Sequence, residues 1–185
     1  MTTRTTGEKR LPGDPTPREY VERAIRVDHA GEYGAKRIYQ GQLAVLGRTK
    51  YGPMIEHMKE QEQVHLDTFS RLIGQRRVRP TALLPIWHVA GFALGAATAL
   101  LGHRGAMACT VAVEEAIDEH YRAQEDALGD DEAELKAHIA QFRAEELEHR
   151  DIGLENEAEQ APAYRLLSAA IKAGCKVAIR ISERV

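Results

Sequence analysis

The amino-acid sequence predicts an all-α protein. Apolar residues recur at intervals of three and four along most of the chain, as they do on the buried face of successive helices. Runs that alternate apolar and polar residues are absent, and aromatic residues make up only 5% of the 185 residues. The length suits one domain, and we expect a disordered lead-in at residues 1–15 followed by a helical domain at residues 16–185.

Charge and cysteine content narrow the classes of function. The formal net charge of −3 gives no basic footprint for nucleic acid, so no nucleic-acid partner is expected. Two cysteines, Cys109 and Cys175, are too few for a disulfide framework and are expected to be small, buried and reduced. The first residues lack the apolar core of a secretory signal and form no recognisable mitochondrial presequence, which favours a bacterial protein or a shortened chain.

The first two helices have clear start signals. Thr16 can cap a helix whose first residue is Pro17, and Glu19 completes a capping box. The inward stripe of this helix consists of Val21, Ile25, Asp28, Glu32, Ala35, Tyr39, Leu43 and Leu46. A second helix follows Gly52-Pro53 and is expected to stop near Gly74. Its inward stripe consists of Ile55, Met58, Glu62, His65, Phe69 and Leu72.

Residues 81–102 carry no formal charge and are flanked by arginines. Their length approaches that of a membrane span, but Pro85, two glycines and many alanines are unusual for one. Three interpretations stay open, namely a helix lying on a membrane surface, a buried connecting helix and a full span, of which we favour the first. The spacing Gly91-x-x-x-Gly95 allows close helix contact, including contact with a second copy of the chain.

Three further helices are expected after this segment. One covers about residues 105–128, with Cys109 or Thr110 facing inward, and Gly129 ends it. The rest of its inward stripe is Glu114, Ile117, Tyr121 and Leu128. Asp130 or Asp131 is expected to cap the next helix. The inward stripe there is Leu135, Ile139, Phe142, Glu146, His149 and Gly153. A last helix begins at Pro162 and follows Leu166, Ile171, Val177 and Ile179.

Carboxylates stand in the apolar stripes of four of these helices. An unpaired buried carboxylate costs several kcal/mol or shifts its pKa until it is neutral, so four such helices need a common explanation. Glu62 and His65 form Glu-x-x-His, and Glu146 and His149 repeat it, so each pair faces one side of its helix. A single glutamate precedes each pair, Glu32 by 30 residues and Glu114 by 32. The sequence therefore contains an internal repeat of a helix pair.

Two copies of this repeat supply four glutamates and two histidines, the ligand set of ferritin-like dinuclear sites. The four carboxylates balance two divalent ions. The sequence thus predicts a ferritin-like four-helix bundle with two additional helices, one of them apolar and membrane-associating. Mixed oxygen and nitrogen ligands suit iron or manganese better than zinc or calcium, and spacing alone does not separate iron from manganese. The proposed ligands are Glu32, Glu62, His65, Glu114, Glu146 and His149.

Other polar residues near the motifs are less informative. Tyr39 and Tyr121 each follow a proposed ligand by seven residues, so they could hydrogen-bond beside the metals or relay electrons. His120 follows Glu114 by six residues, and the sequence leaves open whether it acts beside the ligands or has no role at the site. The acids that fall off the stripes are expected on the surface, namely Glu60, Glu115, Glu145 and Glu148. Histidines that match no ligand spacing are His57, His88, His103 and His138.

Several stretches of the chain resemble the demethoxyubiquinone hydroxylase family, the di-iron monooxygenases of ubiquinone biosynthesis. They are RVDHAGEYG at residues 26–34, AMACTVAVEE at 106–115, EELEH at 145–149, DIGL at 151–154, AGCKVAI at 173–179 and SER at 182–184. The resemblance covers about residues 20 to 185. It implies the same six ligands and catalytic roles beside them for His120 and Tyr121. Mitochondrial members carry a tyrosine near the end of the last helix, where this chain has Arg180.

The resemblance also implies the reaction and its participants. The ring of a demethoxyubiquinol, a polyprenyl quinol, is hydroxylated with two iron ions, O₂ and reducing equivalents that can come from NADH. Family members sit on the membrane that holds the quinone pool, which here means the cytoplasmic face of the inner membrane if the protein is bacterial. Some work with a lipid-binding accessory protein. Two alternatives share the metal site, namely a ferritin-like iron-oxidising or iron-storage protein and a membrane-associated scaffold for quinone biosynthesis.

Overall fold

The structure, a computed structural model, describes residues 13–185, and this part of the chain is helical without a strand. The predicted all-α class is confirmed. The expected lead-in at residues 1–15 lies largely outside the described residues. The helices are α1 (Pro17–Leu46), α2 (Gly52–Arg76), α3 (Leu84–Leu100), α4 (His103–Ala127), α5 (Ala133–Glu155) and α6 (Tyr164–Ser182), with short 3-10 turns η1 (Asp130–Glu132) and η2 (Ala158–Gln160).

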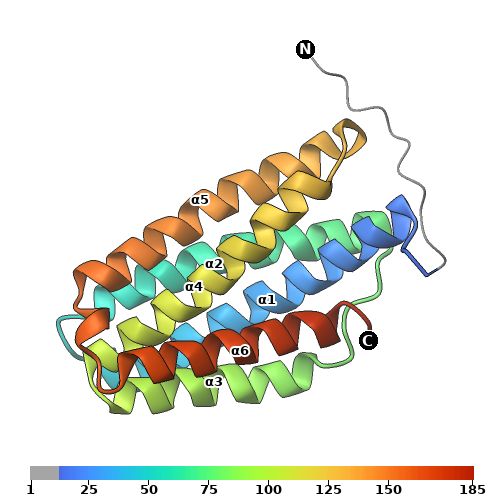
Figure 1. Cartoon of the computed structure of the whole chain (residues 1–185). Coiled ribbons are helices and arrows are strands. Elements are labelled where there is room, and N and C mark those ends of the chain that lie inside the picture. Colours follow the sequence, from blue (N-terminus) through green and yellow to red (C-terminus); the bar gives the residue numbers. More distant parts are fainter. Residues whose placement is uncertain (1–12) are drawn as a thin grey trace.

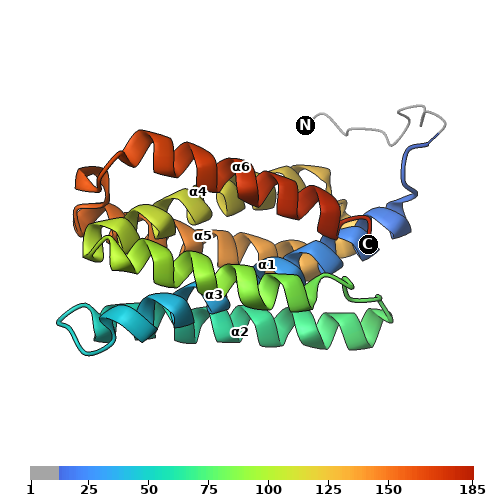
Figure 2. The same cartoon turned by 90° about the horizontal axis from the view of Figure 1, so that it is seen from below.

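The long helices run roughly parallel or antiparallel to one another (Figure 1). Helix α1 packs against α2 and α3, and α4 packs against α5 and α6. Helices α1 and α4 lie between the pair α2 and α5 on one side and the pair α3 and α6 on the other, which Figure 2 shows from below. The chain therefore consists of two similar halves, each starting with a helix pair, and the uncharged segment connects them.

Local signals explain the start of α1, whereas three other helix ends differ from those predicted. The capping box is confirmed, because the Glu19 backbone N–H donates to Thr16 Oγ1 at 3.1 Å and the Thr16 N–H donates to Glu19 Oε2 at 2.7 Å. Helix α2 passes Gly74 and ends at Arg76, before Arg77 with φ +53°. The expected aspartate cap of α5 is wrong, because residues 130–132 form η1 instead. Helix α6 begins two residues after Pro162, at Tyr164.

The buried side chains follow the predicted stripes in α1, α2, α4 and α5. Phe69, Tyr121 and Phe142 share one apolar cluster near one end of the bundle, and Tyr39 and Met58 belong to another. The stripe predicted for the last helix is partly wrong, because Leu166 and Val177 are more than half exposed. The amphipathic pattern of α6 thus has an apolar face that the chain itself does not cover.

Helix α3 uses its two glycines to approach α1. A Cβ atom placed on Gly95 would lie 1.9 Å from the Ile38 carbonyl oxygen, and one on Gly91 would lie 2.8 Å from the Gly34 carbonyl oxygen. The Gly-x-x-x-Gly spacing therefore serves a contact within the chain. The opposite side of this segment is exposed, with Val89 at 66% and Leu100 at 75%. Among the described residues, no helix is both long enough and apolar enough to cross a membrane.

The tight contact at Gly95 gives a prediction for stability. Gly95→Ala should lower the free energy of unfolding by about 1–3 kcal/mol, because the added methyl group meets backbone that cannot move aside easily. Gly34→Ala is the matched control, since a Cβ atom there meets nothing within 4 Å and alanine favours a helix by roughly 0.5–1 kcal/mol. Denaturant titration measures both, and equal stabilities would contradict the close packing.

Candidate metal centre

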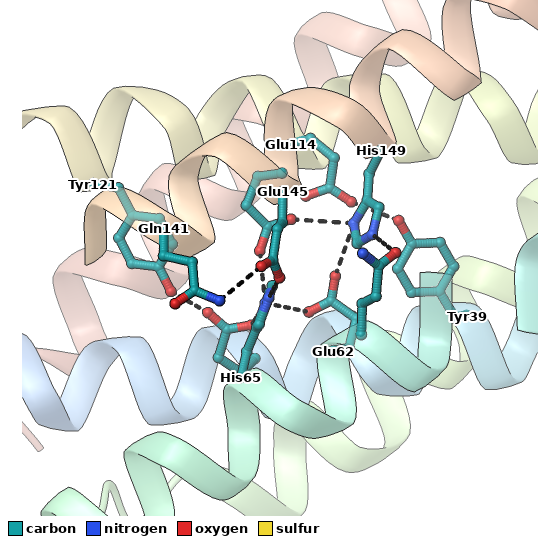
Figure 3. Close-up of polar contacts among 11 residues, drawn as sticks. Tyr39, Glu62, His65, Glu114, Tyr121, Gln141, Glu145 and His149 are labelled. Carbon is teal, nitrogen blue, oxygen red and sulfur yellow. Dashed lines mark hydrogen bonds and ion pairs between the residues drawn. The ribbon is translucent and has the colours of Figure 1, made fainter. Parts of the chain in front are cut away.

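Helices α1, α2, α4 and α5 bring the six predicted side chains into one buried cluster (Figure 3). They form two groups that share two glutamates, and within each group one donor atom per residue lies within 4.8 Å of the others. The first group is Glu32, Glu62, His65 and Glu146, and the second is Glu62, Glu114, Glu146 and His149. None of the six is more than 1% exposed.

Helical spacing accounts for this convergence. Each Glu-x-x-His pair projects from one face of its helix, Glu62 and His65 from α2 and Glu146 and His149 from α5. The single glutamates Glu32 and Glu114 project from α1 and α4. Because the two helix pairs pack with their carboxylate-bearing faces together, the repeat seen in the sequence becomes an approximate two-fold arrangement.

The histidines present Nδ1 to the carboxylates. His65 Nδ1 lies 3.4 Å from Glu32 Oε2 and 3.2 Å from Glu146 Oε1. His149 Nδ1 lies 3.3 Å from Glu62 Oε1 and 3.4 Å from Glu146 Oε2. Both Nδ1 atoms thus point into the cluster, which leaves Nε2 on its outer side. Nδ1 is therefore the nitrogen that a metal at the centre would meet.

The cluster contains buried polar atoms without a hydrogen-bond partner. They are Glu32 Oε2, both Glu62 carboxylate oxygens, His65 Nδ1, Glu114 Oε2, both Glu146 carboxylate oxygens and His149 Nδ1. Leaving so many buried acceptors unsatisfied is costly, and cations among them would satisfy the carboxylates and both nitrogens. The residues therefore fit a dinuclear site with four carboxylates and two imidazoles, a donor set that suits iron or manganese.

Without a metal, the carboxylates of this cluster are buried and repel one another, and both effects shift their pKa values. Burial raises the pKa of Glu62 and of Glu114 well above the usual range, and the charge of Glu146 raises both further. Burial alone would lower the pKa of His65, but the carboxylates of Glu146 and Glu32 close to its Nδ1 atom raise it to about 12. The metal-free centre therefore holds protons on groups that must lose them to bind metal.

Two tyrosines bind the cluster crosswise. Tyr39 on α1 donates its hydroxyl proton to Glu114 Oε1 on α4 at 2.7 Å, and Tyr121 on α4 donates to Glu32 Oε1 on α1. Each tyrosine thus contacts the glutamate of the other half and not the one in its own helix. Burial raises the pKa of both hydroxyl groups well above the usual value, so they are hydrogen-bond donors at neutral pH.

His120 lies beside the cluster and contacts none of the six proposed ligands directly. Its Nε2 atom lies 3.1 Å from Asp28 Oδ1, and Gln124 Nε2 donates to the same oxygen at 2.8 Å. Asp28 is buried, whereas the side chain of His120 is 16% exposed. His120 therefore connects a buried carboxylate, one helical turn before Glu32, to solvent.

Two residues that contact the histidines were not predicted. Glu145 was expected on the surface, but it is half-buried and accepts a hydrogen bond from His65 Nε2 at 2.6 Å. Gln61 Oε1 accepts one from His149 Nε2 at 2.9 Å. Each residue precedes the glutamate of one Glu-x-x-His pair and reaches the histidine of the other pair. The matching position in the repeat is the signal that could have identified them.

Comparison with known proteins places this chain among enzymes. Residues 19–182 match the family described as ubiquinone biosynthesis protein COQ7. The chain belongs to the COQ7 family. The resemblance to the demethoxyubiquinone hydroxylases noted in the sequence is therefore confirmed, and relatives that are 58–64% identical to the chain are named hydroxylases.

Three relatives illustrate how much of the chain the similarity covers. The 3-demethoxyubiquinol 3-hydroxylase of Rhodospirillum rubrum is 64% identical over 183 residues, which cover 98% of this chain and 86% of the relative. The mitochondrial NADPH-dependent 3-demethoxyubiquinone 3-hydroxylase of Bos taurus is 61% identical over 93% of this chain and 81% of its own length. The human enzyme of that name is 58% identical with the same coverage.

Metal removal should make the stability of this COQ7 chain depend on pH. Folded-state pKa values of Glu62, Glu114 and His65 lie above their unfolded values, so the folded state keeps protons that the unfolded chain releases. Stability of the metal-free protein should therefore fall from about pH 7 to about pH 9. With metal bound, cations replace the protons and the fall should be smaller. Denaturant midpoints with and without chelator test this, and identical pH profiles would contradict it.

Proposed function

We propose that this chain hydroxylates the ring of a demethoxyubiquinol in ubiquinone biosynthesis, as an oxygen-dependent enzyme of the 3-demethoxyubiquinol 3-hydroxylase type with two iron ions. One observation carries the proposal beyond family membership. The buried carboxylate and histidine cluster is separated only by a few side chains from an apolar groove that could hold a polyprenyl quinol. The finer fold assignment, a ferritin-like four-helix bundle formed by residues 16–185, rests on the same cluster.

The groove lies between α3 and α6, with α1 and α4 as its floor. Its volume is about 530 Å³, within the range of small-molecule sites. Small and apolar side chains line it, including Ala30, Gly34, Gly91, Leu94, Val113, Ile117, Ala170, Gly174, Ala178 and Ile179. Ala35, Ile38 and Val113 line both the groove and the narrow space beside Tyr39 and Glu114. A quinol ring at the inner end of the groove would therefore be next to the cluster.

The lining suits an isoprenoid tail. Leu94 lines the groove, whereas the Phe92 ring lies under the Arg37 guanidinium group at 5.0 Å. Trp87 Nε1 donates to Ser182 Oγ at 3.1 Å and so links α3 to α6 across one end of the groove. An apolar tail would gain about 0.8 kcal/mol for each methylene group that it buries there.

Different residues of the protein would bind the metals, orient the ligands and exclude water during the proposed hydroxylation. Glu32, Glu62, His65, Glu114, Glu146 and His149 would hold two iron ions, which supply the activation of O₂ when bound. Tyr39 donates a hydrogen bond to Glu114 and Tyr121 donates one to Glu32, and these bonds fix the orientation of both carboxylates. The apolar wall excludes water from the reacting ring. His120, which is partly exposed, links solvent to this region through Asp28.

Product analysis tests the function. Iron-loaded protein, a short-tailed demethoxyubiquinol, ¹⁸O₂ and either NADH or NADPH should give a ring-hydroxylated quinol with one ¹⁸O atom. NADH is the electron source expected from the sequence, and NADPH appears in the names of the mammalian relatives. Oxidation of many ferrous ions per chain without quinol product would favour the iron-storage alternative. Neither activity in metal-loaded protein would favour the scaffold.

We also propose that the protein attaches to the surface of a membrane, the cytoplasmic face of the inner membrane in a bacterium. Exposed apolar side chains of α3 and α6 surround the groove, among them Val89, Leu100, Leu166 and Val177. Such a surface could insert among lipid acyl chains and receive the quinol directly from the bilayer. A homo-oligomer and a lipid-binding accessory protein stay predictions from the sequence and its family resemblance.

Vesicle flotation tests this attachment. The double variant Val89→Asp/Leu100→Asp should lose most of its binding to vesicles with anionic lipid, because two charges enter the apolar surface. Val64→Asp is the control, since Val64 is 58% exposed on α2, a helix that does not line the groove. Turnover of a short-tailed quinol in detergent should stay unchanged in both. Equal flotation of both variants and the wild type would contradict the proposal.

A further inference from the structure

The repeat allows the two halves of the metal centre to be compared residue by residue. Residues of α1 correspond to residues of α4 that lie 82 positions later, and residues of α2 correspond to residues of α5 that lie 84 positions later. Every ligand has a counterpart of the same type, in the pairs Glu32 and Glu114, Glu62 and Glu146, and His65 and His149. Two metal positions built from these ligands alone would be chemically equivalent.

The residues behind the histidines break this equivalence. His65 Nε2 donates to the carboxylate of Glu145 at 2.6 Å, whereas His149 Nε2 donates to the amide oxygen of Gln61 at 2.9 Å. Gln141 Nε2 donates to the other Glu145 oxygen at 2.9 Å and holds that carboxylate in place. Glu145 and Gln61 occupy the same position of the repeat, so the difference is one of charge and not of placement.

A second pair of counterparts, Asp28 and Thr110, also places a carboxylate on the side of Glu32 and an uncharged group on the side of Glu114. Gln124 Nε2 donates to Asp28 Oδ1 at 2.8 Å, and the corresponding Gln42 Nε2 lies 3.3 Å from the hydroxyl group of Thr110. Asp28 stands one helical turn before Glu32, and Thr110 stands one turn before Glu114. Both additional carboxylates, Asp28 and Glu145, are therefore on the side of Glu32 and His65.

We propose that the metal position formed by Glu32, Glu62, His65 and Glu146 binds its ion more tightly than the other and fills first, with Glu145 as the positioning residue that sets the difference. A carboxylate that accepts the Nε2 proton makes an imidazole a stronger donor than an amide does, and such partners change metal affinity about 10- to 100-fold. The carboxylate of Asp28 is held by His120 and Gln124, so Glu145 is the carboxylate that distinguishes the two histidines. This inference rests on the dinuclear site of the proposed function.

Loading with a single ion per chain tests it. Metal-free protein receives one equivalent of ⁵⁷Fe(II) without oxygen, and Mössbauer spectra report the environment of that ion. The wild type should show one dominant ferrous signal. Glu145→Gln should give two signals of similar size, because both histidines then face amides. The double variant Gln61→Glu/Glu145→Gln should reverse the preference toward the second signal.

Controls separate this effect from damage to the site. Glu148→Gln changes an exposed acid of the same helix and should keep the wild-type distribution. If Glu145→Gln fails to fold, Gln61→Glu tests the same point, since it gives both histidines carboxylate partners and should also equalise the signals. Equal signals in the wild type, or an unchanged distribution in the folded variants, would overturn the inference alone. A wild type that binds no iron would overturn it together with the proposed dinuclear site.

Discussion

Replacing Glu146 with alanine is expected to abolish both iron binding and quinol hydroxylation. Glu146 belongs to both groups of the cluster, so its loss removes a ligand from each metal position. It also removes the carboxylate that the two histidines share, whose oxygens lie 3.2 Å from His65 Nδ1 and 3.4 Å from His149 Nδ1. Because loss of even an outer partner lowers metal affinity about 10- to 100-fold, loss of a shared ligand should reduce bound iron and turnover by roughly a hundredfold or more.

Iron content after loading and product formation from a short-tailed quinol measure these effects. Glu148→Ala is the matched control, because Glu148 is an exposed acid of α5 only two residues away. It should bind iron and turn over as the wild type does. Circular dichroism should show that both variants keep their helices. Unchanged iron and turnover in Glu146→Ala would remove this residue from the ligand set.

Replacing Gly174 with leucine should impair long-tailed quinols more than short-tailed ones. Gly174 lines the groove from α6, and a Cβ atom there meets nothing within 4 Å, so leucine can occupy the groove without displacing backbone. If leucine prevents two or three tail carbons from being buried, the loss of about 0.8 kcal/mol for each should raise KM for a long-tailed quinol roughly tenfold or more.

The control for tail binding is Ala173→Leu, an exposed neighbouring position of α6 that does not line the groove. A short-tailed quinol should show little change in KM with either variant. An equal loss on both substrates in Gly174→Leu would mean that the groove does not bind the tail. Gly91 and Gly95 are unsuitable for this test, because larger residues there would first push α3 away from α1.

The sequence predicted the metal cluster well because helical geometry decides it. A glutamate and a histidine three residues apart share a helix face. Carboxylates in the apolar stripes of four helices are buried together in one core, because each of those stripes packs inward. The capping box at Thr16 was equally local and was confirmed. The six residues converge as expected, and their identity as metal ligands stays a prediction for the experiment on Glu146.

Features that depend on packing between elements were missed. The position of Glu145 off its own helix stripe suggested solvent, but that face turns toward His65 of the facing helix. The groove could not be foreseen, because it exists only where α3 and α6 each pack on α1 and α4 without closing on each other. The outward positions of Leu166 and Val177 have the same origin, since an apolar stripe does not say which surface will cover it.

The crosswise bonds of Tyr39 and Tyr121 have a consequence for the integrity of the protein. Each candidate metal position would take its ligands and its supporting tyrosine from both halves of the chain, so neither half could assemble a complete position by itself. A bound ion would therefore link the two halves of the chain through its ligands. A protease cut in the segment between α2 and α3 should therefore give two fragments that stay associated more strongly with the ions in place than without them.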